Sequence, residues 1–323
     1  MNTITALYCM QISQFLPRCG HHALYFHDGY YHWCFQLLDT PGYLVGTSGS
    51  SLVRTPPDFT WRTRSTKYFF LFFIFYYWYR SHDIDHPGHS QNLEIARESE
   101  LALRYNDTAV LESYHAHKTF QLLKSDDMNI FCNLTQDQYK YCRKSILKCI
   151  LGTDMSKHFL LLENLMNRVG RAKNKDISMG SSEHDKSFGR LSSASASSST
   201  GMLFDRHDDG DRLELLEMIV HTADLSGQAS PYEEAKQWGD KVISEFKDER
   251  LQHEKEGFSP PAFMDGIDSR YDELMLQSSF IKNIVQPLWE WMHEALGSLD
   301  EPVEYLQRNR EKYEKEAASI ETG

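Results

Sequence analysis

From Asn92 onward, apolar residues recur at the three- and four-residue spacing of an amphipathic helix, with charged residues between them. This spacing limits the possible folds more than any other feature of the chain, because a helix-period pattern cannot keep its apolar residues on one face of a strand. No run with the period-two alternation of a half-buried strand stands out after Ser81. The sequence therefore predicts an all-α domain. The pattern predicts helices at 139–150, 157–169, 211–222, 232–256, 272–295 and 302–318.

Two stretches interrupt this pattern. Residues 1–67 show weak periodicity and clustered turn signals, and no helix is predicted there. Residues 170–210 are rich in Ser, Gly, Lys and Asp, and such a segment cannot bury enough apolar surface to offset the entropy lost on ordering. The sequence therefore predicts an N-terminal segment of different character, 1–80, followed by a helical domain, 81–318, with a flexible surface insertion at about 170–210.

The residues just before Ser81 form an unbroken aromatic and aliphatic run from Tyr68 to Tyr79. A bilayer span needs about 20 apolar residues, so this run is too short for one, and polar residues close it from Arg80 onward. We expect a buried helix here and no membrane span. The N-terminus also lacks the basic region and the cleavable apolar core of a signal peptide.

Composition limits the classes of partner and compartment. The formal net charge is −12, which argues against nucleic-acid binding, where a basic face supplies most of the affinity. If the substrate is an anion, local cations must overcome this negative background, and bound metal ions do so most directly. The six cysteines form no CxxC pair, which favours a reducing, cytoplasmic compartment over a zinc ribbon or a disulfide framework.

The segment from His82 to His86 reads His-Asp-Ile-Asp-His and is followed by Pro-Gly. A helix would place residues three and four apart on one face, so that His82, Asp83 and His86 converge on one site. Imidazole nitrogen and carboxylate oxygen together suit a divalent metal, and a carboxylate can bridge two ions. The sequence therefore predicts a metal site here.

A second carboxylate, Asp224, directly follows the strongly apolar segment 211–222. A carboxylate in such a place is costly unless something neutralises it, and a metal ion would do so. The alternative is that Asp224 caps the helix that follows. Asp224 alone leaves the two interpretations about even, but the upstream His-Asp motif favours metal ligation.

Five sequence blocks, in order, resemble those of one family. They are similar to the HDxDHPG, LAxxYNDxSVLExxH, TDMSKH, HxADLS and QxxFIxxxxxPLW motifs of the class I cyclic nucleotide phosphodiesterases, and they lie at 82–88, 101–115, 153–158, 221–226 and 277–289. Together they cover roughly residues 81–293, and the Ser-rich insertion falls between the third block and the fourth.

The resemblance implies a compact multi-helix metallohydrolase of the HD type with two divalent cations. His82, Asp83 and Asp224 would hold a tight Zn²⁺, and Asp83 would also touch a second ion, Mg²⁺ or Mn²⁺. The residues that would orient water around the second ion are His86, Glu112, His115, Thr153 and Asp154. The two cations would lower the pKa of a bridging water and clamp the phosphoryl oxygens, so that cyclic AMP, cyclic GMP or both are opened to the 5′-monophosphate in cyclic nucleotide signalling.

The resemblance also implies a pocket for the base of the cyclic nucleotide. Gln277 matches the family's purine-reading glutamine, whose amide both donates and accepts hydrogen bonds. Phe280 and Val242 match a clamp on the two faces of the purine ring. The positions that match the remaining pocket residues are Trp238, Phe246 and Met155. Plain core packing is the alternative interpretation for Trp238, Val242, Phe246 and Phe280. Without the surrounding motifs, it would be the favoured interpretation.

One block of the family is missing upstream. The family carries HNxxHA, whose first His is the general acid and whose second is a ligand of the tight metal. The segment Tyr31 to Leu38 resembles a shortened version of this region, and His32 then stands for the general acid while the metal lacks one ligand. Alternatively, His27 and His32 stand for the pair, although the extra residue between them breaks the i,i+4 register of a helix. The alternative to both is that His27 and His32 are solvated loop histidines, and it carries about half of the weight.

These departures leave several hypotheses open. The missing block fits either a faulty N-terminal gene model or a catalytically impaired paralogue that binds nucleotide as a regulatory module. The base pocket departs too, because Gly227 stands where the family usually has Asn and Ala235 where a Tyr is common. An HD-type phosphohydrolase of another phosphoester would explain the His-Asp motif but not Gln277 and Phe280. A homodimer is compatible with the resemblance, and the sequence does not distinguish cyclic AMP from cyclic GMP.

Overall fold

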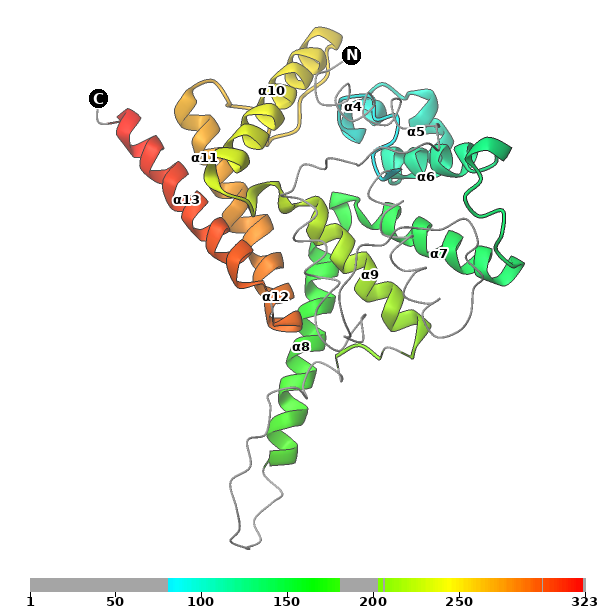
Figure 1. Cartoon of the computed structure of the whole chain (residues 1–323). Coiled ribbons are helices and arrows are strands. Elements are labelled where there is room, and N and C mark those ends of the chain that lie inside the picture. The colour runs from blue at the N-terminus through cyan, green and yellow to red at the C-terminus, as the bar shows by residue number, and fades with distance from the viewer. Residues whose placement is uncertain (1–80, 181–202, 206, 298, 322–323) are drawn as a thin grey trace, which may run out of the picture.

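The computed structural model describes residues 81–180, 203–205, 207–297 and 299–321, and all the regular structure in these ranges is helical (Figure 1). The predicted all-α fold is confirmed. The longer helices are α4 (Gln91–Ala96), α5 (Glu100–Tyr105), α6 (Val110–Leu122), α7 (Gln136–Gly152), α8 (His158–Gly180), α9 (Asp209–Asp224), α10 (Tyr232–Glu256), α11 (Arg270–Phe280), α12 (Gln286–Leu296) and α13 (Asp300–Glu321). The segments 1–67 and 68–79, with His27 and His32, lie outside the described residues.

The helices form two groups around α8 and α9 (Figure 1). On one side, α6 packs against α7, and α7 packs against α9. On the other side, α13 packs along α11 and also contacts α10 and α12. Helix α12 joins the two groups, because it packs against both α8 and α9.

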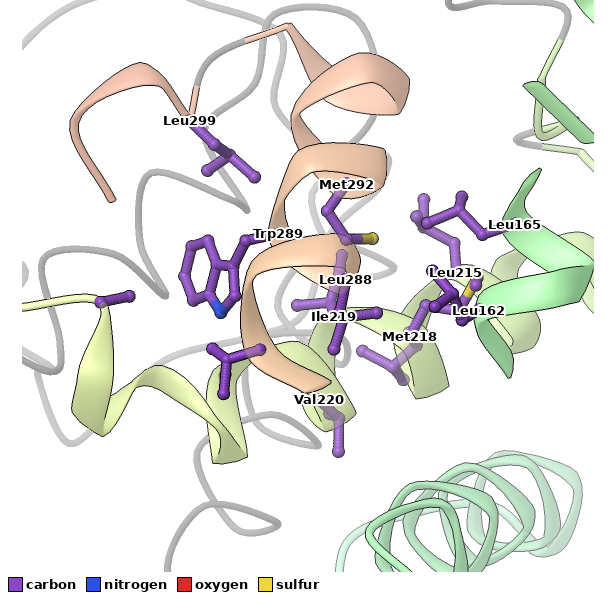
Figure 2. Close-up of a cluster of buried hydrophobic side chains, with 14 of the residues drawn as sticks. Leu162, Leu165, Leu215, Met218, Ile219, Val220, Leu288, Trp289, Met292 and Leu299 are labelled. Carbon is purple, nitrogen blue, oxygen red and sulfur yellow. The ribbon is translucent and has the colours of Figure 1, made fainter. Parts of the chain in front are cut away.

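The predicted apolar face of residues 211–222 lies in the core. Figure 2 shows side chains of α8, α9 and α12 gathered in one cluster, in which Trp289 of α12 is fully buried. Leu215, Met218 and Ile219 of α9 belong to this cluster and are buried. Burial of these side chains supplies the main stabilising free energy of the fold, as is general for globular domains.

The helix predicted at 272–295 is interrupted. A π-helical segment, η5 (Ile281–Val285), separates α11 from α12. Pro287, in the first turn of α12, has no N–H to donate to a carbonyl four residues earlier, so a regular ladder of hydrogen bonds cannot run through this point. Ile281 and Val285, the first and last residues of the π-helical segment, are both buried.

The insertion predicted at 170–210 is narrower in the structure. Helix α8 continues past Gly170 to Gly180, and α9 begins at Asp209. Before α9, Phe204 is buried beneath the guanidinium of Arg168, which lies 4.7 Å from the ring centroid. The same guanidinium donates to the carbonyl oxygen of Leu203 at 3.1 Å, so one side chain of α8 holds the end of the insertion. Residues 181–202 lie outside the described residues.

None of the described helices combines the length and the hydropathy that a bilayer span requires.

Candidate active site

His82, Asp83 and Asp224 converge in space although they are far apart in the sequence. The Nε2 atom of His82 lies 3.2 Å from Oδ2 of Asp83 and 3.2 Å from Oδ1 of Asp224. One ligand atom from each residue lies within 4.8 Å of the other two, the only such group of three or more His, Cys, Asp or Glu side chains among the described residues. Asp224 ends α9, and the next helical turn, Ser226–Gln228, has Leu225 as its N-cap residue and no side-chain cap, so the capping interpretation is wrong.

The electrostatics of this group favour a bound cation. Burial disfavours the charged imidazolium, but the two carboxylates hold the pKa of His82 well above its ordinary value. Partial loss of solvent around the half-exposed carboxylate of Asp83 opposes its charge, but the attraction of His82 outweighs this and lowers the pKa of Asp83. An imidazole between two carboxylates is a donor set that a divalent cation accepts in place of the proton, and three protein ligands leave coordination positions open for water or substrate. The residues present therefore fit a divalent metal ion.

The segment from Ser81 to Gly88, here called the metal-binding turn, is not the helix that the i,i+4 argument assumed. Its backbone makes two successive turns, in which the N–H of Ile84 donates to Ser81 and that of His86 to Asp83, both at 3.2 Å. Pro87 disfavours the helical conformation at His86, and Gly88 adopts a φ of 82°. Turns, and not a helix, therefore bring His82 and Asp83 to the site. The prediction that a helix face shared with His86 does so is wrong.

His86 and His115 lie together beside this turn. Their rings stack with centroids 5.5 Å apart, and the backbone N–H of Gly88 donates to Nδ1 of His86 at 3.0 Å. Nδ1 of His115 lies 2.8 Å from the carbonyl oxygen of Ile84, which can only accept, so His115 carries its proton on Nδ1. Burial lowers the pKa of His115 to about 4. Its Nε2 is therefore left as a hydrogen-bond acceptor at neutral pH.

Glu112 and Asp154 supply two further carboxylates near the turn. Burial, followed by the neighbouring charges of Asp154 and Asp83, raises the pKa of Glu112 to about 7. Its Oε2 is buried and makes no hydrogen bond to the protein. Asp154 accepts from the backbone N–H of Ser156 at 2.8 Å, and Thr153 donates to the carbonyl oxygen of Ile150 at 2.8 Å. The buried, unpartnered oxygen of Glu112 is suited to orienting a water.

Sequence reasoning missed residues that support this site. The side-chain amide of Gln91 accepts from the backbone N–H of Val110 at 3.1 Å and donates to Asp154 at 3.4 Å, so it ties the start of α6 to the end of α7. Tyr114 and Lys118 of α6 both donate to Asp85, at 2.6 and 2.9 Å. These hydrogen bonds lower the pKa of Asp85. Neither contact has a signal in the sequence, because each depends on the path of the turn.

Gln277 is buried in a polar network between α10 and α11. Its Oε1 accepts from Nε2 of Gln228 at 2.9 Å, and its Nε2 donates to the carbonyl oxygen of Gly239 at 3.3 Å. Gln228 also lies 3.4 Å from the hydroxyl of Tyr313. A Cβ at Gly239 would lie 2.9 Å from Cδ of Gln277, so this glycine makes the close approach possible. Sequence reasoning also missed Gln228, which follows Gly227, the glycine that stands where the family usually has Asn.

The other predicted pocket residues come from α10, α11 and the turn after α7. Trp238, Val242 and Phe246 are spaced four residues apart on one face of α10, and Val242 is 39% exposed. Phe246 makes an edge contact with Phe263, with centroids 5.2 Å apart. Phe280 is partly buried and packs against the core, as the alternative of core packing requires. Met155 is exposed, at 42%.

Comparisons with known proteins give one family. A family model described as 3′5′-cyclic nucleotide phosphodiesterase matches residues 73–306. The chain is 32% identical over 234 residues to "3′,5′-cyclic-AMP phosphodiesterase 4C" of Mus musculus and to "3′,5′-cyclic-AMP phosphodiesterase, isoform F" of Drosophila melanogaster, in each case over 72% of this chain. It spans only 30% and 31% of the length of these two relatives.

Solved structures give the same result. The phosphodiesterase domain of the RhoPDE fusion protein from the choanoflagellate Salpingoeca rosetta is similar, with a TM-score of 0.66 and 27% sequence identity. The similarity covers 79% of this chain and 71% of that one.

Proposed function

Because this chain belongs to the 3′5′-cyclic nucleotide phosphodiesterase family, we propose that it hydrolyses cyclic AMP, cyclic GMP or both to the 5′-monophosphate. The observation that carries the proposal is the convergence of His82, Asp83 and Asp224 from two distant segments. Among the relatives, the two named above are cyclic-AMP phosphodiesterases, which favours cyclic AMP as the first substrate to test.

The family implies divalent metal ions, and the His-Asp-Asp group is able to hold one. We assign His82, Asp83 and Asp224 to a Zn²⁺ site, with Asp83 shared by a second ion, Mg²⁺ or Mn²⁺. When bound, such ions stabilise charge on the phosphoryl oxygens and make water a stronger nucleophile at neutral pH. The carboxylate of Asp83 is half-exposed, which supports its sharing by two ions.

Residues of α6 and of the turn after α7 would orient water molecules and accept protons from them. Glu112 offers a buried Oε2 as an acceptor for a water proton. His115 keeps its proton on Nδ1, against Ile84, and presents Nε2 as a second acceptor. His86, Thr153 and Asp154 would hold further water molecules in place. The role of general acid stays with His32 as a prediction from the sequence.

The base would lie against α10 and α11. Gln277 would pair with the purine edge, since its amide has one N–H and one lone pair left beyond its contacts with Gln228 and Gly239. Phe280 and Val242 would hold the faces of the ring, with Trp238, Phe246 and Met155 along the wall. Stacking of aromatic and apolar side chains on a base tolerates either purine, so discrimination would fall to Gln277.

The test is a product assay on the full chain. Purified protein, loaded with Zn²⁺ and Mg²⁺, is incubated with cyclic AMP or cyclic GMP, and the 5′-monophosphate is measured by chromatography. We expect turnover by the wild type and a loss of at least 100-fold for D224N, because removing a charged ligand weakens metal binding and charge stabilisation. The control is D248N, an exposed acid on α10. Absence of 5′-monophosphate from folded, metal-loaded wild type would overturn the proposal.

Two finer expectations accompany the function. We propose a cytoplasmic location, supported by the free thiols of Cys132, Cys142 and Cys149, and retain the homodimer as a prediction. Size-exclusion chromatography with light scattering decides the homodimer, because a mass near 37.6 kDa at micromolar concentration would contradict it.

A further inference from the structure

One face of α6 contacts the metal-binding turn at three successive places. Thr119 lies 3.4 Å from the carbonyl oxygen of Ser81, and His115 donates to that of Ile84 at 2.8 Å. Tyr114 and Lys118, which directly precede His115 and Thr119 in the helix, donate to the carboxylate of Asp85. The contacts therefore flank His82 and Asp83 on both sides in the sequence.

Asp85 is the position where the turn needs such support. Its φ is 61°, in the left-handed region, where a residue with a Cβ pays a conformational cost of about 1 kcal/mol. A backbone of this kind persists only when its surroundings hold it. The carboxylate of Asp85 accepts from the phenol of Tyr114 at 2.6 Å and from the ammonium of Lys118 at 2.9 Å, so that two α6 side chains hold it.

The two donors are also held relative to each other. Tyr114 and Lys118 are one helical turn apart, and the Lys118 ammonium lies 5.2 Å from the centroid of the Tyr114 ring. Lys118 and Asp85 are 32% and 55% exposed, and an ion pair so exposed adds little to the global stability of a protein. Any effect of the pair is therefore expected in the local conformation of the turn and not in the unfolding free energy.

We propose that Tyr114 and Lys118 are positioning residues which, through Asp85, hold the metal-binding turn in the conformation that faces His82 and Asp83 toward Asp224. The proposal rests on the metal site proposed above. Both side chains contact Asp85, and each acts through it.

The sign of one measurement separates positioning from simple electrostatics. Replacing Lys118 by Met removes a positive charge near a cation site, and Coulomb repulsion alone would then make cation binding stronger. Loss of positioning would make it weaker. Replacing Tyr114 by Phe changes no charge, so any loss of affinity there comes from the lost hydrogen bond.

The experiment measures Mn²⁺ binding to the full chain by electron paramagnetic resonance, with activity left aside. We expect Kd to rise about three- to tenfold in Y114F and in K118M, the size expected for losing one partly exposed charged hydrogen bond. K118R, which keeps the charge and a donor, should restore the wild-type affinity. The matched control is K124M, which removes the same charge from an exposed lysine just beyond the end of α6.

The outcomes are distinguishable. Tighter or unchanged Mn²⁺ binding in both K118M and Y114F, with binding lost in D224N, overturns the positioning role and leaves the metal site intact. No binding by the wild type overturns the metal site and this proposal together. A metal-free melting temperature that falls by more than about 4 °C in Y114F or K118M would mean that the pair stabilises the whole domain, which also contradicts the proposal.

Discussion

Two glycines within helices have opposite surroundings. In α10, a Cβ at Gly239 would lie 2.9 Å from both Cδ and Oε1 of Gln277, whereas a Cβ at Gly170 in α8 would meet nothing within 4 Å. Glycine in a helix interior costs about 1 kcal/mol relative to alanine. Gly170 bears this cost without any compensating contact, whereas Gly239 permits the contact with the proposed base-reading amide.

Replacing each of these two glycines by alanine should therefore have a different effect. G170A should stabilise the protein by about 0.5 to 1 kcal/mol, measured by urea unfolding. G239A has the same intrinsic gain but pushes Gln277 aside, so we expect little or no net stabilisation and a KM for cyclic nucleotide at least tenfold higher. An unchanged KM in G239A together with the full stability gain would show that Gln277 is not held where we describe it.

At the scale of elements, two buried histidines connect three helices. Nδ1 of His221 in α9 donates to the carbonyl oxygen of Gly152, the last residue of α7, at 2.9 Å. Its Nε2 must then accept, so Nδ1 of His158 at the start of α8 donates to it at 3.0 Å. Burial, followed by the proximity of His221, lowers the pKa of His158 to about 4. Both histidines are neutral in the folded protein at pH 7.

A pH prediction follows from this link. The folded pKa of His158 lies below the ordinary value of 6.5, so its contribution to stability is complete above about pH 6.5 and is lost as the pH falls through about 4. We expect the unfolding free energy of the wild type to fall across this window more steeply than that of H158Q. H117Q, at an exposed position of α6, serves as the control. Parallel pH curves for the wild type and H158Q would contradict the buried neutral state.

The sequence predicted elements better than it predicted their ends. The helix at 232–256 was predicted with both ends as the structure has them, because a Pro precedes it and Gly257 ends it with a φ of 81°. The interruption at Ile281–Val285 was missed, because apolar spacing does not distinguish an α-helix from a π-helical segment. The continuation of α8 to Gly180 was missed since one glycine and a polar composition resemble a loop.

For the candidate site too, the sequence predicted the main residues but not the details of their arrangement. The convergence of His82, Asp83 and Asp224 was predicted from the motifs. The shared helix face predicted for His82, Asp83 and His86 was wrong, because the backbone turns at Asp85. The sequence did not predict the supporting residues, because their contacts join segments that are distant in the chain. These residues are Gln91, Tyr114, Lys118 and Gln228. Spacing along one element carries no information about such partners.

At the scale of the whole molecule, Trp289 belongs to the core cluster in which α12 meets α8 and α9 (Figure 2). It is fully buried, and its Nε1–H has no hydrogen-bond partner in the described part of the chain. W289A should therefore destabilise the protein by about 3–5 kcal/mol in urea unfolding. W289F removes the unpartnered N–H and keeps an aromatic ring, so its cost should be under half of that. Equal costs for the two variants would contradict this description of the core.

The proposed hydrolysis depends most on one cation shared by His82, Asp83 and Asp224. Anomalous diffraction at the zinc absorption edge, from crystals grown with Zn²⁺, locates such an ion directly. We expect a peak about 2.0–2.2 Å from Nε2 of His82 and from carboxylate oxygens of Asp83 and Asp224. A zinc peak bound elsewhere, with these three side chains uncoordinated, would contradict the central claim.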